Sequence, residues 1–291
     1  MLAGGQGSFI KFGTPWRQHP AKSKQEQLLG LISPQGETFA LAKLILIEIV
    51  MPQKTIELYD LGHAAYQPIW DLQKSVQQRI IDEKRAEQKG EFKGKRLDDL
   101  LFFVEHPHIY TLGKSGREEH MLRSVMELQQ LEAEFLKIDR GGDITYHGPG
   151  QIVGYPILDL DRHFTDVHKY LRFLEEIMIR VCADYGFEAH QIDGATGVWV
   201  NNEKICAMGI RCSRWVTMHG FALNVNTDLR YFNNIVPCGI DDKAVTSLQK
   251  LSGKEIDLEE VKERIVFHFQ EIFGVTITPK GSLQEVEQII L

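Results

Sequence analysis

Residues 140–151 read RGGDITYHGPGQ, and five of these twelve residues are glycine or proline. Glycine adopts positive φ angles and lets a ligand approach the main chain without a Cβ in the way. Apolar, strand-like sequences flank this stretch at 135–138 and 152–158. The pattern predicts a tight loop between two buried strands, which is a usual place for a binding site on a rigid scaffold. The alternative is a glycine-rich turn that binds nothing.

The composition is that of an ordinary globular protein. The chain has 291 residues, of which 43% are hydrophobic and 25% are charged. Its net charge of −7 argues against general nucleic-acid binding, which needs a basic surface. The longest apolar run, 39–51, contains Lys43 and Glu48. It is shorter than the roughly 20 residues of a membrane span.

The cysteines indicate a reducing compartment. There are four of them, and no two form a Cys-x-x-Cys pair, so we expect neither a structural zinc site nor any other bound metal. So few cysteines in a chain of this length do not form a disulfide scaffold, and we expect a cytoplasmic protein. Cys182, Cys206 and Cys212 fall in or beside a predicted helix or strand and are interpreted as structural.

The N-terminal segment differs from the rest of the chain. The first 24 residues contain four basic residues and no acidic one, and they show no hydrophobic period. They hold one arginine and few serines, a poor match to a mitochondrial presequence. A strand-like sequence begins only after Met51. We therefore expect residues 1–50 to be an extension that is poorly ordered or not native, and 51–291 to be the catalytic domain.

Hydrophobic periodicity predicts a mixture of helices and hairpin-forming strands. Helical patterns cover 65–91, 119–132, 166–186, 229–235 and 258–273. Strand patterns cover 55–61, 100–104, 109–112, 151–160, 197–200, 204–211 and 217–226. Charges of both signs fill 83–96, which predicts a solvated face, and the residues after 273 are interpreted as a tail. This order favours an α+β fold with a mixed sheet over a strictly alternating parallel fold.

Two residues suggest thiol chemistry. Cys238 stands between Pro237 and Gly239, on a sharply turned backbone and outside any apolar period. A thiolate is a nucleophile, and a nearby cation lowers its pKa. Lys204 begins a predicted strand, and beside a thiol it would stabilise the thiolate and move a proton. The alternatives are a surface cysteine without a role and an ordinary solvated lysine.

Two histidines lie in or near these segments. His219 and Gly220 interrupt the apolar run of 217–226, and His147 ends the polar part of the glycine-rich stretch. For both histidines the simpler interpretation is a structural role with satisfied hydrogen bonds. Asn224 and Asn226 are interpreted as polar partners at the end of a strand.

Five segments together resemble the octanoyltransferase family of lipoate biosynthesis. They are RGGDITYHGPGQ (140–151), GVWV (197–200), KICAMGIR (204–211), HGFALNVN (219–226) and PCGI (237–240). The resemblance extends from about Thr55 to Phe273, with the motifs in the order of the family. Each motif alone is weak evidence, whereas their combination is specific.

The resemblance implies a fold and a reaction. The fold would be the single-domain α+β fold of biotin and lipoate protein ligases, a mixed β-sheet covered by helices with the acyl chain in a slot. An octanoyl group would arrive as a thioester on the phosphopantetheine arm of acyl carrier protein. Cys238 would take it as an acyl-enzyme thioester, and Lys204 would lower the pKa of that thiol. A lysine ε-amine on a lipoyl domain would then receive the group as an amide, without a cofactor.

The resemblance also assigns the substrate contacts and partners. The acceptors would be lipoyl domains of 2-oxoacid dehydrogenase complexes and the glycine cleavage H protein, and neither nucleic acid nor membrane would take part. The expected substrate-binding residues are Arg140, Gly141, Gly142, Asp143, Ile144, Thr145, Tyr146, His147, Ala207, Met208, Gly209, Gly220, Phe221 and Ala222.

Three alternatives remain open from the sequence. The first is an ATP-dependent lipoate or biotin ligase on the same fold, which needs no catalytic cysteine. The second is an amidotransferase that moves octanoyl groups between lipoylated proteins. The third is an acyl-binding protein without enzymatic activity. A mitochondrial location applies only if residues 1–50 are a transit peptide.

Overall fold

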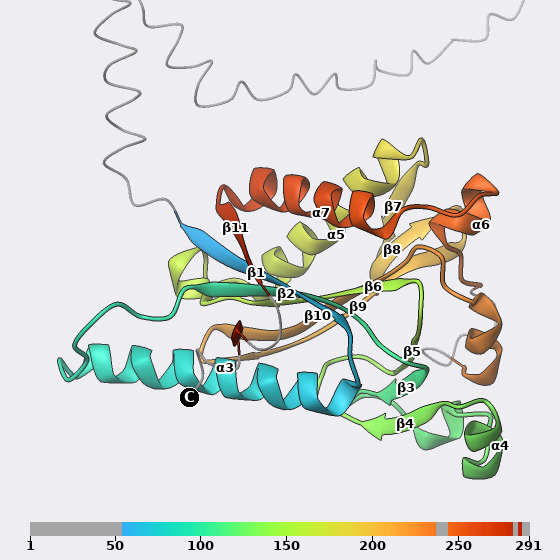
Figure 1. The fold of residues 1–291 in the computed structure, drawn as a ribbon, viewed down its shortest axis with the longest axis horizontal. Helices are drawn as coiled ribbons and strands as arrows, with labels where there is room; N and C mark the ends of the chain where they lie inside the picture. The colour runs from blue at the N-terminus through green and yellow to red at the C-terminus, as the bar shows by residue number, and fades with distance from the viewer. Residues whose placement is uncertain (1–53, 237–243, 282–284, 287–291) are drawn as a thin grey trace, which may run out of the picture. The chain divides into compact units, whose positions relative to one another are not determined.

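The computed structural model describes residues 54–236, 244–281 and 285–286, and the predictions for residues 1–50 and Cys238 lie outside these ranges. The described chain contains a large mixed sheet of eight strands in the order β11-β1-β2-β6-β10-β9-β8-β7 (Figure 1). Strand β1 pairs in parallel with β2 and β11, and every other neighbouring pair is antiparallel. The predicted α+β class with a mixed sheet is therefore confirmed.

Most of the eight strands coincide with strands predicted from the sequence. The strands are β1 (Thr55–His63), β2 (Asp99–Glu105), β6 (Gln151–Ile157), β7 (Ala189–Ile192), β8 (Ala195–Val200), β9 (Glu203–Ser213), β10 (Val216–Asn224) and β11 (Thr276–Gly281). Asn201, at the predicted hairpin between β8 and β9, has a φ of 53°, a left-handed conformation that asparagine tolerates.

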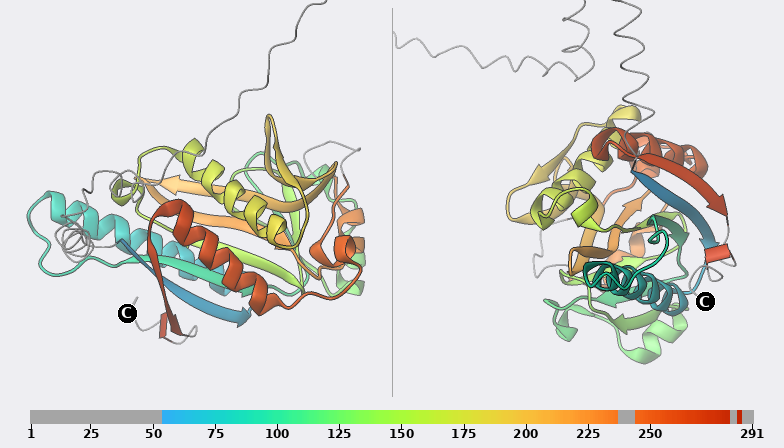
Figure 2. Two further views of the ribbon diagram at one scale, coloured as in Figure 1. Left: turned by 90° about the horizontal axis from the view of Figure 1, so that it is seen from above. Right: turned by 90° about the vertical axis from the view of Figure 1, so that its left-hand side faces the viewer.

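Helices cover both faces of this sheet. Helix α3 (Tyr66–Gln88) packs on one face, while α5 (Val167–Asp184) and α7 (Leu258–Phe273) lie side by side on the other (Figures 1 and 2). Each of the latter two begins at an aspartate whose side chain accepts a hydrogen bond from the first turn, Asp166 in α5 and Asp257 in α7. Gly274, with a φ of 63°, ends α7.

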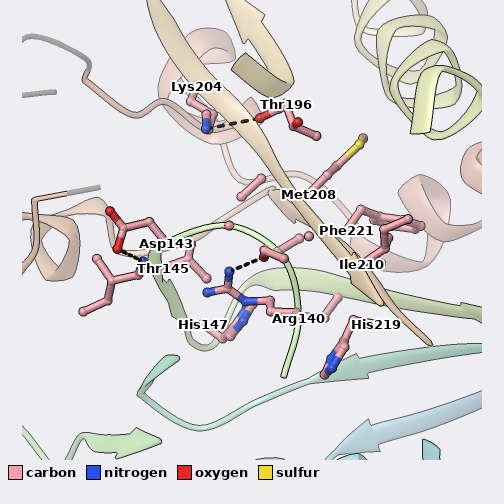
Figure 3. Close-up of a pocket in the computed structure, with 18 of the residues that line it drawn as sticks. Arg140, Asp143, Thr145, His147, Thr196, Lys204, Met208, Ile210, His219 and Phe221 are labelled. Carbon is pink, nitrogen blue, oxygen red and sulfur yellow. Dashed lines mark hydrogen bonds between the residues drawn. The ribbon is translucent and has the colours of Figure 1, made fainter. Parts of the chain in front are cut away.

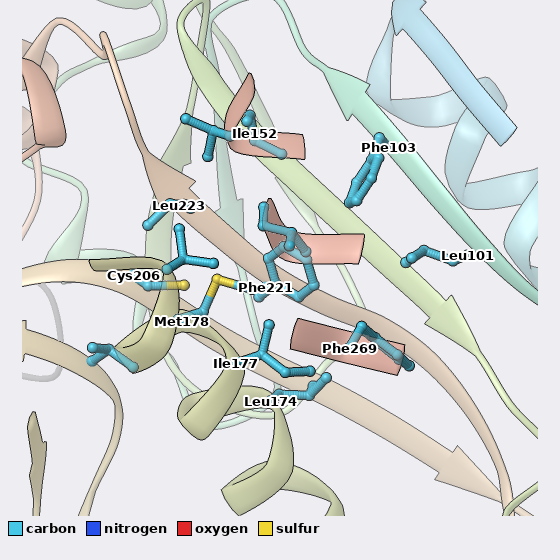
Figure 4. Close-up of a cluster of buried hydrophobic side chains, with 14 of the residues drawn as sticks. Leu101, Phe103, Ile152, Leu174, Ile177, Met178, Cys206, Phe221, Leu223 and Phe269 are labelled. Atoms are coloured by element: carbon cyan, nitrogen blue, oxygen red, sulfur yellow. The ribbon is translucent and has the colours of Figure 1, made fainter. Parts of the chain in front are cut away.

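The apolar stripe of α5 forms the centre of one hydrophobic core. Leu174, Ile177 and Met178 are fully buried there and pack with Phe221 and Leu223 of β10 (Figure 4). These helix positions recur at helical spacing, so the periodicity that predicts the helix also identifies its buried face. A second core forms between α3 and the opposite face of the sheet.

The sequence predicts a loop for the glycine-rich stretch, but the centre of this stretch forms a strand. Strand β5 (Ile144–His147) pairs antiparallel with β3 (Ile109–Leu112), which also pairs in parallel with β4 (Glu134–Lys137). This pairing satisfies the backbone groups of the stretch. The short run of four residues between glycines gave no visible strand period in the sequence.

Two other predictions are wrong. The residues after 273 do not form a tail, since β11 adds a parallel strand to β1 with Ile277 opposite Ile56. The segment 119–132 is not one helix. It contains a 3₁₀ turn at Glu118–His120 and the helix α4 (Val125–Gln130), which begins at a capping box of Ser124 and Glu127.

The charged stretch 83–96 is only partly solvated. Lys84 is buried and binds Asp159 at 2.6 Å and Asp161 at 2.7 Å. Arg96 pairs with the other carboxylate oxygen of Asp159. Asp159 is fully buried, so these cations neutralise a carboxylate that has no access to water. Lys93 is exposed, as predicted.

Replacing Asp159 with alanine is expected to lower the free energy of unfolding by about 3 kcal/mol, because Lys84 and Arg96 lose the buried carboxylate between them. Urea unfolding at neutral pH measures this change. Lys93→Ala is the control and should change stability by no more than about 0.5 kcal/mol. Equal effects of the two substitutions would show that the buried pairs contribute nothing.

Candidate active site

A cavity of about 590 Å³ lies between the glycine-rich stretch and strands β8, β9 and β10 (Figure 3). Lys204 lines it, together with every residue predicted to bind substrate except Tyr146. Segments that are far apart in the sequence are therefore brought to one surface. Apolar side chains form a large part of that surface, namely Leu171, Trp199, Met208, Ile210, Phe221 and Phe232.

Glycines allow the main chains around the cavity to approach each other closely. A Cβ on Gly209 would lie 2.7 Å from the carbonyl oxygen of Gly141, and a Cβ on Gly113 would lie 2.3 Å from that of Gly142. The Gly141 amide donates to the carbonyl oxygen of Ile210 at 2.9 Å. The glycine-rich stretch thus rests directly on β9, which only residues without a side chain permit.

Arg140 fixes this stretch from within. Its Nη2 donates to the carbonyl oxygen of Thr111 at 2.6 Å and to the hydroxyl of Thr111 at 3.1 Å. Its Nη1 donates to the carbonyl oxygen of Gly141 at 3.0 Å. Bonds from a charged donor are stronger than those from a neutral one, so the buried guanidinium holds the wall of the cavity in place.

Tyr146 lies behind the wall instead of lining it. It is fully buried, its hydroxyl lies 2.7 Å from Nδ1 of His108, and its ring stacks on Tyr231 with centroids 5.0 Å apart. Side chains alternate across a strand, so Tyr146 points away from the face that Thr145 and His147 present to the cavity. Because β5 is absent from the predicted elements, this alternation was missed.

Main-chain hydrogen bonds hold Lys204 in place. Its amide donates to the carbonyl oxygen of Ala244 at 2.9 Å, and its carbonyl accepts from Thr246 at 3.0 Å. The Nζ lies 4.7 Å from the ring centroid of Trp199 and 3.4 Å from the carbonyl oxygen of Thr196. Ala244 directly follows residues 237–243, the segment that contains Cys238 in the sequence.

A buried polar network connects the glycine-rich stretch with the partners of Lys204. The side-chain carbonyl oxygen of Gln151 lies 2.8 Å from Nδ1 of His147, and the side-chain amide nitrogen of Gln151 donates to Oδ1 of Asn224 at 2.8 Å. Asn224 in turn donates to the carbonyl oxygen of Thr246 at 3.1 Å. The prediction of Asn224 as a strand-end polar partner is confirmed. Its contact with Thr246 was missed, because the two residues are 22 positions apart.

The described cysteines are unsuited to nucleophilic chemistry. Burial raises the pKa of the Cys182 thiol to about 12 and the pKa of the Cys206 thiol well above its ordinary value. Burial also raises the pKa of the half-buried Cys212 thiol. These three thiols stay protonated at neutral pH, in agreement with a structural role.

The fold and the cavity define a lipoyl protein ligase A/B catalytic domain, the family that residues 65–270 match. A bipartite lipoate protein ligase from Thermoplasma acidophilum superposes with a TM-score of 0.60 at 14% identity, covering 82% of this chain and 91% of that one. A lipoate-protein ligase A with bound ATP gives a TM-score of 0.59 at 13% identity, covering 82% and 92%. These similarities confirm the predicted ligase-type fold.

Curated relatives narrow the family further. An octanoyltransferase of Christiangramia forsetii is 55% identical over 228 residues, 76% of this chain and 96% of that protein. One of Flavobacterium psychrophilum is 53% identical over 230 residues, 77% and 99% respectively. The chain belongs to the octanoyltransferase family and is an acyltransferase. None of the helices in the described ranges is long and apolar enough to cross a membrane.

The buried histidines His147 and His106 are expected to make the folded protein less stable in acid. Burial lowers the pKa of His147 to about 3, with a further contribution from His106, and it lowers the pKa of His106 to about 4. Histidine in an unfolded chain titrates near pH 6.5. Between these values the unfolded chain binds protons that the folded protein does not, so stability falls as the pH falls from about 6.5 toward 4.

His147→Gln is expected to reduce this pH dependence by up to about 1.4 kcal/mol per pH unit, because one of the two groups no longer titrates. Urea unfolding of the wild type and the variant at several pH values from about 4.5 to 6.5 measures the two slopes. Identical slopes would show that His147 takes up protons in the folded protein as it does in the unfolded chain, and would contradict the lowered pKa.

Proposed function

We propose that the protein transfers an octanoyl group from octanoyl-acyl carrier protein, through a thioester on Cys238, to the ε-amine of a lysine on a lipoyl domain. The observation that carries the proposal is the position of Lys204 on a largely apolar cavity that the motif residues 140–145, 147, 207–209 and 220–222 also line. Membership in the octanoyltransferase family supports the acyl group and the reaction.

The cavity suits a medium-length acyl chain. Its apolar side chains would remove the chain from water, and each buried CH₂ contributes about 0.8 kcal/mol. The volume of about 590 Å³ leaves room for the thioester next to the chain. An apolar slot with a few polar groups at defined positions is the usual design of a ligand pocket.

Cys238 is the proposed nucleophile. An ordinary thiol is only a few per cent ionised at neutral pH, and a nearby ammonium raises that fraction. Six positions separate Cys238 from Ala244, which bonds to the main chain of Lys204. Covalent geometry limits the distance between these two Cα atoms to about 20 Å. The Lys204 ammonium is the proposed partner that lowers the pKa of the thiol.

The reaction then needs two acyl transfers. The Cys238 thiolate attacks the carbonyl carbon of the donor thioester, the C–S bond of the donor breaks, and the Lys204 ammonium gives its proton to the departing phosphopantetheine thiolate. The acceptor amine next attacks the Cys238 thioester, the C–S bond breaks, and Lys204 in its neutral form takes the proton of the amine. The exchange between thioesters is nearly isoenergetic, so it requires no ATP. The thiolate fraction of Cys238 and the alignment of the substrate then largely set the rate.

The proposed partners follow from the same reaction. The acceptors are lipoyl domains of 2-oxoacid dehydrogenase complexes and the glycine cleavage H protein. The bipartite ligase of Thermoplasma acidophilum forms an archaeal lipoylation system with its E2 lipoyl domain, which supports a lipoyl acceptor here. We place the reaction in the cytoplasm. We also propose residues 51–291 as the catalytic unit, because about three quarters of this chain covers almost the whole of its curated relatives.

Incubation with octanoyl-acyl carrier protein is expected to add one octanoyl group to the enzyme. Intact-mass spectrometry measures the adduct, and hydroxylamine should remove it, because thioesters are labile to this nucleophile. Cys238→Ser should show no hydroxylamine-labile adduct. Lys204→Ala should form the adduct at least about tenfold more slowly at pH 7 and approach the wild-type rate at higher pH, where the thiol ionises unaided. An adduct that persists in Cys238→Ser would contradict the proposed nucleophile.

The acyl donor distinguishes this reaction from that of an ATP-dependent ligase and from that of an amidotransferase. Octanoyl-acyl carrier protein should modify a lipoyl domain without ATP, whereas free octanoate with ATP and Mg²⁺ should give no product. Gel shift or mass spectrometry of the lipoyl domain measures the outcome. Product from octanoate and ATP would identify a ligase. Product from an octanoylated H protein as the preferred donor would identify an amidotransferase.

A further inference from the structure

Glu175 on α5 is a buried carboxylate that the proposed reaction does not use. Its side chain is 1% exposed. Its Oε2 accepts from Nη1 of Arg172, one turn earlier on the helix, at 2.6 Å. Its Oε1 accepts from the main-chain amide of Gly197 on β8 at 2.9 Å. A buried charge costs free energy unless it is paired and hydrogen-bonded, and these two bonds hold the carboxylate in one position.

The amide that Glu175 binds belongs to the same peptide group as the carbonyl of Thr196. The N–H and the C=O of a trans peptide lie in one plane and point in opposite directions. At the other edge of this peptide group, the Thr196 carbonyl oxygen accepts from Nζ of Lys204 at 3.4 Å (Figure 3). Glu175 and Lys204 therefore bind opposite edges of one peptide group.

The chain on either side of this peptide group lies against the Lys204 side chain. Gly197 is buried and has a φ of 126°, a conformation that favours glycine. A Cβ on Gly197 would lie 2.6 Å from the carbonyl oxygen of Cys206 and 3.5 Å from Cε of Lys204. Two residues further along β8, the centroid of the Trp199 ring lies 4.7 Å from Nζ of Lys204. The direction of the peptide 196–197 thus decides what the ammonium contacts.

The charge of Glu175 also polarises this peptide group. A carboxylate at the N–H increases the partial negative charge on the carbonyl oxygen, which becomes a stronger acceptor for an ammonium. Burial is the main cause of the raised pKa of the Cys206 thiol, but Lys204 lowers this pKa and Glu175 raises it, so both charges lie near that side chain. Glu203, next to Lys204 in the sequence, pairs with Lys250 at 2.7 Å. Loss of Glu175 would therefore weaken the bond from Lys204 to this carbonyl.

We propose that Glu175 is a positioning residue for Lys204, because it fixes the peptide 196–197 with its carbonyl toward the ammonium. The ammonium then stays at one place, from which it stabilises the thiolate of Cys238. Glu175 does not line the cavity, so it acts through the peptide group and not on the substrate. The inference rests on the pairing of Lys204 with Cys238 in the proposed function and adds the residue that maintains it.

The test measures alkylation of Cys238 by iodoacetamide as a function of pH, because the thiolate is the reactive form and no acyl donor is needed. Mass spectrometry of the peptide that contains Cys238 separates it from the other thiols. Glu175→Met keeps the approximate shape of the side chain but removes the acceptor. It should raise the midpoint of the pH profile by at least about half a unit, roughly a threefold loss of thiolate below the midpoint.

Rescue by the conservative variant separates positioning from charge. Glu175→Gln keeps a carbonyl oxygen for the Gly197 amide and should leave the midpoint within about 0.2 units of the wild type. Arg172, which is half exposed, also bonds to Gln191 at 3.0 Å and keeps that partner in the variant. Glu175→Asp withdraws the carboxylate by about 1.5 Å. It should shift the midpoint in the same direction as Glu175→Met, and it replaces that variant if the methionine protein does not fold.

Two further variants complete the comparison. Glu176→Ala is the matched control on α5, since Glu176 pairs with Arg180 at the surface, and it should not change the midpoint. Lys204→Ala defines the largest shift. If Lys204→Ala leaves the midpoint unchanged, the pairing of Lys204 with Cys238 is wrong, and the inference fails with it. If only Lys204→Ala shifts the midpoint, or if Glu175→Gln shifts it as far as Glu175→Met, the positioning role is wrong while octanoyl transfer stands.

Discussion

The cavity depends on main-chain contacts between glycines across the centre of the large sheet. Gly220 of β10 lies opposite Gly209 of β9, and a Cβ on Gly220 would lie 2.2 Å from the carbonyl oxygen of Gly154 on β6. Gly209 in turn lies beneath Gly141 of the glycine-rich stretch. These four residues form a continuous row from β6 to the wall of the cavity. A side chain at Gly220 or Gly209 would collide with the backbone of Gly154 or Gly141, and one at Gly154 would collide with the ring of Phe221. The close packing below the cavity therefore requires glycine at these positions.

Hydrogen bonds to the described chain fix the residues on both sides of the segment 237–243. Before it, the Val236 amide donates to the carbonyl oxygen of His120, and Asn234 is bonded to Tyr110 and Arg123. After it, Ala244 bonds to the main chain of Lys204. The aromatic stack of Tyr146, His108 and Tyr231 supports the 3₁₀ turn Leu229–Asn234 that leads into the segment. Tyr146 therefore contributes to the site from behind its wall, although it does not reach the cavity.

Local patterns in the sequence were sufficient for the long helices and for most strands of the large sheet. The stripe of Leu174, Ile177 and Met178 identified both α5 and its buried face, because a helix repeats its contacts every three to four residues. β5 and β11 were not predictable in this way, since each is a short strand defined by a distant partner, β3 for one and β1 for the other. The motifs identified the cavity residues, but only the pairing of β5 shows that Tyr146 points away from the cavity.

The role of His219 shows most clearly what the sequence leaves open. Its position in an apolar run favoured a structural histidine, and its bond to Asp139 agrees with that interpretation. The structure adds two features that the sequence does not reveal, a φ of 61° and an Nδ1 without a hydrogen-bond partner in the described chain. Both features cost free energy, which the bond of the ring to Asp139 and the bond of the amide to Gln73 offset in part.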